Sequence, residues 1–269
     1  MAPLMRDPRA IRAACLAFAA ILAGAYAPGA PPSPPESLAG WKLVRTLPLR
    51  GRTYHVQGVD TDSRHVWVTS CDRDARKAWL HQFSLASGAL ERAVEITDGA
   101  RYHPGGIDTD AHSLWVPVAE YRPNSTAVIE RLNKRTLQVE FRFSVPDHIG
   151  CVAATPGTLA GGNWDSKQFY VWDRRGKLLR TVANPSYNNY QDMKFVSPFL
   201  IASGLFPGRA EGAVDWIEWP GLTLARRLPA GANGQGVPYT REGMSFRGNR
   251  LLFVPEDGPS RLFVFEARK

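Results

Sequence analysis

The stretch His103-Pro104-Gly105-Gly106-Ile107-Asp108-Thr109-Asp110, followed by Ser113-Leu114-Trp115-Val116-Pro117-Val118-Ala119-Glu120-Tyr121, decides the fold of this chain. It predicts two short adjacent strands joined by an Asp-rich turn. A polar residue stands at each of the two ends that would emerge on the same side, His103 and Glu120. The stretch therefore predicts one hairpin of a sheet with polar groups collected at one edge.

Versions of this unit recur along the chain. Subtracting the residue numbers of Gly58, Gly106, Gly150, Asp192 and Gly243 gives spacings of 48, 44, 42 and 51 residues. A period of about 40–50 residues with four short strands is typical of β-propeller blades. The fifth copy lacks its outer strand, whereas the predicted strand 41–49 has no repeat of its own.

We therefore predict an all-β chain that forms a five-bladed β-propeller of four-stranded blades. The N-terminal strand 41–49 would close the last blade and remove an open sheet edge. A six-bladed ring is the alternative, but it would need a blade hidden in a connection, and the longest candidate, 230–241, is too short.

The N-terminal region predicts an export signal. Arg6, Arg9 and Arg12 precede an apolar run over 13–25 that is short for a membrane span. We expect a signal peptide over 1–25, a Pro-rich linker over 26–40 and the propeller over 41–269. The mature protein would be secreted or periplasmic, without membrane contact, although an uncleaved anchor stays open.

The charge and the cysteine content limit the classes of partner and the disulfide pairing that we expect. The formal charge is +8, but the basic residues are spread out, which argues against a nucleic-acid partner. We expect a monomer that takes a small-molecule ligand or substrate. Cys71 and Cys151 lie after the predicted signal, and either a disulfide or two half-buried thiols agrees with the sequence.

The predicted topology gathers polar residues at one end of the central channel. In a propeller blade, the start of the first strand and the end of the second open on the same face. The strand starts place there His55, Gln57, His103, Asp147, His148, Tyr190, Gln191, Asp192, Arg241 and Glu242. The ends of the second strands add Ser70, Asp72, Glu120, Asn163, Asp165, Ser203, Glu256 and Asp257. Imidazoles with carboxylates suit a transition metal or zinc, and oxygen-rich sets suit Ca²⁺. A water-filled channel lined by polar groups without any ligand is the alternative.

Other residues of the repeat have structural roles in this interpretation. Gly105 and Gly106 predict a close backbone approach at the axis. Asp60, Asp62, Asp108 and Asp110 occupy equivalent positions and are expected to cap turns on the opposite face. Packing between blades is the role expected for Trp67, Trp115, Trp164 and Trp172, although Trp164, next to Asn163 and Asp165, could instead form the floor of a ligand site.

The motifs HPGGIDTD, VPVAEYRPNS, DHIG, GGNWDS, YQD, EGM and PEDGPS resemble an uncharacterised family of secreted β-propellers from bacteria and fungi. The resemblance covers roughly residues 41–269 and implies the fold without an activity. More remotely, the predicted channel mouth is similar to gluconolactonase and strictosidine-synthase-like propellers. That similarity implies an axial divalent cation, with Glu120, Asn163 and Glu256 in the ligand roles. The five predicted blades and the three histidines depart from that superfamily, which has six blades.

The leading functional hypothesis is an exported, metal-assisted hydrolase of small esters or lactones. A divalent cation, Ca²⁺ or a transition metal, would be held by some of His103, His148, Glu120, Asn163 and Glu256. Glu242 or His55 would act as the base and Arg241 as the oxyanion or substrate anchor. Ligand contacts would come from Gln57, Trp164, Tyr190, Gln191 and Asp192. The alternative is a non-catalytic propeller that binds an extracellular small molecule or glycan, with Trp164 and Tyr190 as stacking surfaces.

Overall fold

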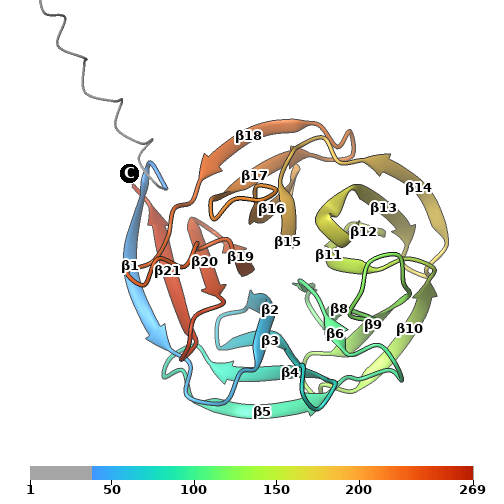
Figure 1. Cartoon of the computed structure of the whole chain (residues 1–269), viewed down its shortest axis with the longest axis horizontal. Helices are drawn as coiled ribbons and strands as arrows, with labels where there is room; N and C mark the ends of the chain where they lie inside the picture. The colour runs from blue at the N-terminus through green and yellow to red at the C-terminus, as the bar shows by residue number, and fades with distance from the viewer. Residues whose placement is uncertain (1–37, 269) are drawn as a thin grey trace, which may run out of the picture. The chain divides into compact units, whose positions relative to one another are not determined.

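The computed structural model describes residues 38–268, which form five antiparallel sheets arranged around a common axis (Figure 1). In the four sheets built from consecutive strands, the first strand lies at the centre and the last strand lies at the rim. The predicted five-bladed β-propeller is thereby confirmed. The predicted signal peptide and the linker up to residue 37 lie outside the described residues.

The five blades follow one another along the chain. Blade 1 contains β2 (His55–Thr61), β3 (His65–Asp72), β4 (Lys77–Ser84) and β5 (Leu90–Glu95). Blade 2 contains β6 (His103–Pro104), β7 (Asp108–Thr109), β8 (Ser113–Ala119), β9 (Ala127–Asn133) and β10 (Val139–Val145). Blade 3 contains β11 (Ile149–Thr155), β12 (Thr158–Asn163), β13 (Gln168–Asp173) and β14 (Leu178–Ala183), with the short 3₁₀ helix η1 (Trp164–Ser166) after β12.

The last two blades complete the ring. Blade 4 contains β15 (Asn189–Val196), β16 (Phe199–Leu205), β17 (Gly212–Glu218) and β18 (Leu224–Pro229). Blade 5 contains β19 (Glu242–Arg247), β20 (Arg250–Pro255) and β21 (Arg261–Ala267), and β1 (Trp41–Pro48) is its outermost strand.

The inner strand of blade 2 is interrupted, whereas the sequence predicts a single short strand within 103–110. Two short segments, β6 and β7, pair with β8 on either side of the interruption. Between them, Gly106 N donates to Gly150 O of blade 3 (2.9 Å), and Val152 N donates to Gly106 O (3.1 Å). A Cβ atom on Gly106 would lie 2.5 Å from Gln191 O of blade 4. The predicted close backbone approach at the axis is thus confirmed. At Gly106, hydrogen bonds to blade 3 replace the hydrogen bonds to β8 that a continuous inner strand would make.

Strand β1 closes the ring as predicted. It pairs antiparallel with β21, from Trp41 opposite Ala267 to Pro48 opposite Arg261. Residues 38–40 of the predicted linker form a turn in which the buried Leu38 donates its N–H to Pro229 O of blade 4 (2.8 Å). The chain segment before β1 is therefore fixed to the propeller from Leu38 onward.

The apolar cores lie between neighbouring blades. Five clusters of buried side chains are present, and each joins residues of two consecutive blades around the ring. Trp67, Trp115 and Trp172 are nearly fully buried in two of these clusters, which confirms their predicted packing role. Burial of these aliphatic and aromatic side chains between neighbouring sheets stabilises the ring of blades.

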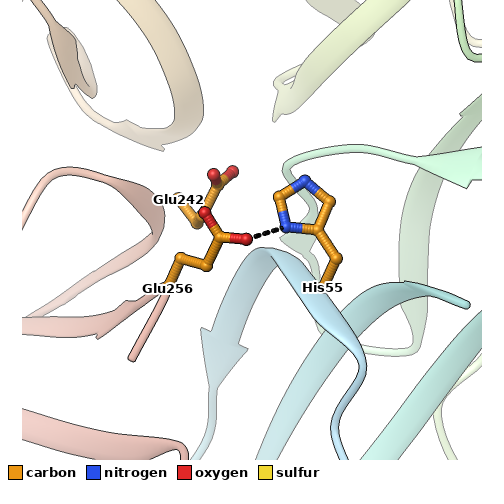
Figure 2. Close-up of side chains that lie close together, drawn as sticks. All are labelled: His55, Glu242 and Glu256. Atoms are coloured by element: carbon orange, nitrogen blue, oxygen red, sulfur yellow. Dashed lines mark ion pairs between the residues drawn. The ribbon is translucent and has the colours of Figure 1, made fainter. Parts of the chain in front are cut away.

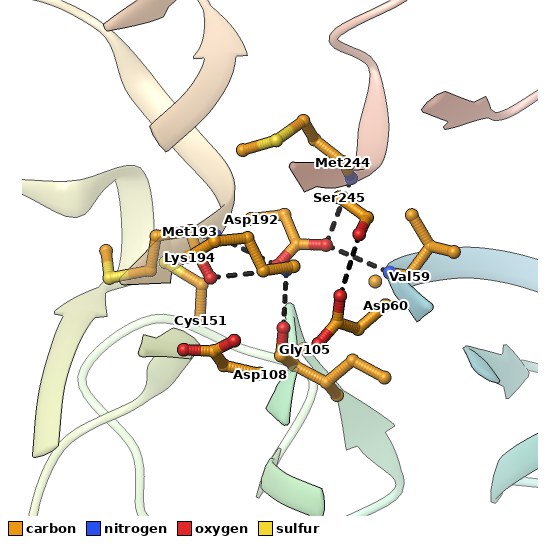
Figure 3. Close-up of polar contacts among 12 residues, drawn as sticks. Val59, Asp60, Gly105, Asp108, Cys151, Asp192, Met193, Lys194, Met244 and Ser245 are labelled. Atoms are coloured by element: carbon orange, nitrogen blue, oxygen red, sulfur yellow. Dashed lines mark hydrogen bonds and ion pairs between the residues drawn. The ribbon is translucent and has the colours of Figure 1, made fainter. Parts of the chain in front are cut away.

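A buried polar network crosses the axis beneath the channel mouth (Figure 3). Lys194 of blade 4 donates to Asp192 Oδ1 and to Ile107 O of blade 2, both at 2.5 Å. Asp192 Oδ2 accepts the N–H groups of Val59 of blade 1 (2.9 Å) and Met244 of blade 5 (3.0 Å). This one carboxylate therefore ties three blades together.

Two further aspartates extend the network, and the turn-cap prediction is wrong for both. Asp108 Oδ2 accepts the N–H of Ala154 of blade 3 (2.7 Å), and Asp60 Oδ1 accepts the hydroxyl of Ser245 of blade 5 (2.7 Å). Both carboxylates are buried because their strands bring them toward the axis. The prediction holds for Asp62 and Asp110, which accept backbone N–H groups of their own turns.

The two cysteines are both free and fully buried, and burial raises the pKa of the Cys71 thiol to about 11. Within residues 38–268, no helix has the length and apolar character that a membrane span requires.

Candidate axial site

A cavity of about 180 Å³ opens at the predicted end of the channel. Its walls come from the starts of inner strands and from the ends of second strands, as the repeat predicted. The lining residues are His55, Gln57, His103, Tyr121, His148, Gly150, Asn163, Trp164, Asp165, Asn189, Tyr190, Gln191 and Glu242. Amides, imidazoles and the aromatic residues Tyr121, Trp164 and Tyr190 dominate this wall, so the cavity is polar without being strongly charged.

One side of the cavity carries a cluster of three ionisable groups, which we call the axial triad: His55, Glu242 and Glu256 (Figure 2). One nitrogen or oxygen atom of each lies within 4.8 Å of the others. His55 Nδ1 is 2.5 Å from Glu256 Oε1, but the contact lacks the geometry of a normal hydrogen bond. Among residues 38–268, no other group of three His, Cys, Asp or Glu side chains converges in this way.

Glu242 is the most unusual member of the axial triad. Its φ angle is 92°, a left-handed conformation that costs a non-glycine residue roughly 1–3 kcal/mol. The residue is 6% exposed, and no residue in the described part of the chain hydrogen-bonds its carboxyl group. Burial, together with the negative charge of Glu256, raises the pKa of Glu242 to about 8.

Glu256 has the opposite electrostatic environment. The neighbouring His55 holds the pKa of the Glu256 carboxyl below its usual value, although partial burial opposes this. Two half-exposed guanidinium groups also lie beside it: Arg241 Nε at 3.1 Å from Oε2 and Arg73 Nη2 at 3.9 Å from Oε1. The raised pKa of Glu242 favours its protonated form, whereas the lowered pKa of Glu256 favours its ionised form.

The other two histidines lie across the cavity among aromatic rings. His103 stacks on Tyr121, with ring centroids 4.2 Å apart, and its buried Nδ1 has no hydrogen-bond partner among the described residues. His148 Nδ1 lies 2.9 Å from Glu120 O, and since a carbonyl oxygen only accepts, this nitrogen carries the proton. Burial lowers the pKa of both imidazoles, so both are neutral near pH 7.

The five residues predicted to hold a metal are not brought together as one set. Asn163 lines the cavity, but its oxygen accepts the N–H of Gln168 (2.9 Å). Glu120 turns away and is held by Arg122 and by the Thr126 hydroxyl. His103 and His148 share the aromatic side of the cavity, and Glu256 joins the axial triad instead.

The other predicted site residues lie in three places: at the axial triad, in the cavity lining and in the buried network below. His55 and Glu242, predicted as catalytic, lie together in the axial triad, with Arg241 beside them. Gln57, Trp164, Tyr190 and Gln191 line the cavity. The Tyr190 hydroxyl is directed away from it, because it donates to Asp215 Oδ2 (2.7 Å). Asp192 is fully buried in the axial network below.

Sequence reasoning missed Tyr121 and Arg73 as parts of the site, and Lys194 as part of the network beneath it. Tyr121 follows the last polar residue of its strand, as Trp164 follows Asn163, so an aromatic in this repeat position was a usable signal. Lys194 lies two residues after the aligned Asp192, where other repeats have Asp60, Asp108 and Ser245. A period of two places these side chains on the same face of their strands. No comparable signal exists for Arg73, which lies in a turn.

The arrangement offers three chemical capacities. The axial triad can accept or donate a proton or ligate a cation. Arg73 and Arg241 can hold an anionic group at the mouth. The rings of Tyr121 and Trp164 can stack against a ligand, while the amides bond its polar groups.

Comparison with solved structures returned several propeller-containing proteins of low sequence identity. The structure of BamB from Moraxella catarrhalis is 14% identical, with a TM-score of 0.42 and coverage of 82% of this chain and 61% of that chain. The Pan2 WD40 domain of Neurospora crassa is 8% identical, with a TM-score of 0.47 and coverage of 85% and 96%. Hydrazine synthase of Kuenenia stuttgartiensis is 12% identical, with a TM-score of 0.46 and coverage of 79% and 66%. The present chain thus spans about three fifths of the length of the BamB chain.

A search of curated proteins found no match. The remote similarity to gluconolactonase-like propellers stays a prediction. A family model described as a family of unknown function, DUF6454, matches residues 37–218, which is more than half of the chain. Its match covers β1 and blades 1 to 3 and most of blade 4, and it ends before Glu242 and Glu256. The chain therefore belongs to this family of unknown function.

Proposed function

We propose that the protein is a hydrolase of small esters or lactones that acts in the axial cavity. The observation that carries the proposal is Glu242, a buried carboxyl group without a hydrogen-bond partner in the described region. It is held in a strained backbone conformation against His55 and Glu256. Strain at a buried ionisable residue is characteristic of functional sites, because a merely structural position would favour glycine.

In the proposed reaction the axial triad activates water. The water oxygen attacks the ester carbonyl carbon, the carbon–oxygen bond to the alcohol breaks, and the proton from water ends on the departing alkoxide. Arg241 stabilises the negative charge that develops on the carbonyl oxygen. The cavity volume of about 180 Å³ limits the substrate to a small molecule.

The N-terminal sequence is the basis for proposing where in the cell the protein acts. The arginines and the apolar run within residues 1–25 support export, so we propose that the protein meets its substrate outside the cytoplasm. Signal cleavage in an expression host, measured by intact mass, checks this part independently of the activity.

The hydrolase proposal is tested with 4-nitrophenyl acetate, dihydrocoumarin and γ-butyrolactone as probes. Wild-type protein should hydrolyse at least one of them, and Glu242→Gln should reduce kcat/KM by at least 100-fold, because water activation is lost. Glu120→Gln is the matched control, since that carboxylate is directed away from the cavity. Equal rates for wild type and Glu242→Gln on all three probes would rule out hydrolysis by this site.

A second candidate is a non-catalytic propeller that binds a small hydroxylated molecule or glycan. The observation that favours it is the cavity lining, which contains the rings of Trp164 and Tyr121 and the amides of Gln57 and Gln191. Aromatic stacking with amide hydrogen bonds suits a neutral polyol. Calorimetric titration with monosaccharides should then show binding that Trp164→Ala abolishes and Glu242→Gln leaves intact.

A further inference from the structure

We infer that His55, Glu242 and Glu256 form a binding site for one divalent transition-metal cation. The inference deepens the proposed function, because the cation would supply the water activation assigned to the axial triad. Its part in hydrolysis rests on that function, whereas cation binding itself rests on the geometry.

The first argument is the unsatisfied carboxyl group of Glu242. Buried polar groups are nearly always hydrogen-bonded, since an unpaired one loses the interactions that water provided. Glu242 is 6% exposed, lacks such a partner in the described region, and its carboxyl group lies beside that of Glu256 (Figure 2). A cation between the two carboxylates would interact favourably with both of them.

The second argument is the position of the ligand atoms. His55 Nδ1 and Glu256 Oε1 lie side by side at 2.5 Å without a well-directed hydrogen bond, and Glu242 contributes an oxygen within 4.8 Å of both partners. Ligands at about 2.0–2.2 Å from one ion lie at most roughly 4.4 Å from each other. Small side-chain rotations would therefore bring all three atoms onto a single cation.

The ligand types decide the class of cation. One imidazole with two carboxylates suits Zn²⁺, Mn²⁺, Co²⁺ or Fe²⁺, whereas Ca²⁺ takes six to eight oxygen ligands. Two ionised carboxylates and a neutral imidazole would also balance a charge of +2. Three protein ligands leave a coordination position for water, as in catalytic zinc sites. Arg241 at Glu256 Oε2 and Arg73 near Glu256 Oε1 repel a cation and should limit its affinity.

The inference is tested by isothermal titration of EDTA-treated, desalted full-length protein with ZnCl₂ and with MnCl₂. We expect one equivalent of at least one cation to bind. Each of His55→Asn, Glu242→Gln and Glu256→Gln should weaken binding at least tenfold, while Glu120→Gln should leave it unchanged. Thermal unfolding of each metal-free variant checks folding, and Co²⁺ absorption near 500–600 nm gives a second readout of ligation by the triad. Binding of no cation, or binding that survives all three triad substitutions, would overturn the inference.

The two proposals fail in different ways. A stoichiometric cation on the axial triad, with no hydrolysis of the ester and lactone probes, supports the cation site and removes the hydrolase. Hydrolysis that depends on Glu242 but is unchanged by EDTA, in protein that elemental analysis finds free of metal, overturns the cation site and keeps the hydrolase.

Discussion

Glu242 and Glu130 are two buried glutamates with different surroundings. Glu242 lies at the cavity, where a ligand can reach it. Glu130 lies in β9 of blade 2, is 3% exposed, and its Oε2 has no hydrogen-bond partner among the described residues. Burial raises the pKa of Glu130 to about 7, with Arg142 partly offsetting the effect. Because Glu130 does not line the cavity, its raised pKa bears on stability.

The pKa of Glu130 gives a pH-dependent prediction. A carboxyl group whose pKa is higher in the folded state favours folding at low pH, and that contribution is lost as the pH rises from about 4.5 to about 7. Glu130→Gln removes the titration, so its stability relative to wild type should increase by up to about 3 kcal/mol between pH 4 and pH 8. Urea unfolding at the two pH values measures the difference.

The control for this prediction is Glu140→Gln, which removes a charge from an exposed side chain of the same blade. A pH-independent difference between Glu130→Gln and wild type would show that the carboxyl group is not perturbed in the fold.

At the residue scale, sequence reasoning could place side chains at the channel mouth but could not orient them. Glu120 and Glu256 occupy equivalent strand ends, yet only Glu256 reaches the axial triad. Glu120 is instead captured by Arg122 and Thr126, which are neighbours in its own loop. These hydrogen bonds depend on the conformation of the loop after the strand, which the alternation of residues in the strand does not determine.

At the scale of elements, β1 makes a specific contribution to stability. Trp41 is buried against blades 4 and 5 and meets the Phe246 ring edge-on at 6.1 Å, whereas Val44 of the same strand is 45% exposed. Trp41→Ala should cost about 3–5 kcal/mol of unfolding free energy, because it leaves a cavity in this cluster.

Val44→Ala is the matched substitution in the same strand and should cost less than about 0.5 kcal/mol. Chemical denaturation followed by circular dichroism compares the two variants. Similar losses would mean that β1 is held by its backbone pairing with β21 alone.

The strands themselves were largely predictable, because alternation and turn residues repeat in every blade. The exception is the inner strand of blade 2. Gly105 still donates its N–H to Pro117 O of β8, whereas Gly106 leaves that ladder and bonds to blade 3. The two glycines lie against the backbones of blades 3 and 4. The glycine pair indicated a close approach, but the partner segments are far away in sequence. Nothing in the local pattern could identify them.

For the whole molecule, the axial network acts as a common junction of the five blades. Lys194 is buried and neutralises part of the charge of Asp192, Asp108 and Asp60. Lys194→Met should destabilise the protein by about 3–5 kcal/mol, because it leaves buried carboxylates without a counter-charge.

Lys167→Met, at an exposed lysine of blade 3, controls for the change in net charge. Guanidinium unfolding monitored by tryptophan fluorescence measures both variants. A loss below 1 kcal/mol for Lys194→Met would show that the aspartates, rather than the ion pair, hold the blades together.

The pairing of β1 with β21 has a consequence for biosynthesis. During translation, β1 is synthesised before every other strand of the propeller. Its pairing partner β21 is synthesised only with blade 5. The sheet of blade 5 therefore depends on contacts between residues that are far apart in the sequence. Glu242 and Glu256 belong to that same late blade, while His55 belongs to the earliest one. The three groups therefore meet only when the ring is completed, so an unfinished polypeptide lacks the axial triad.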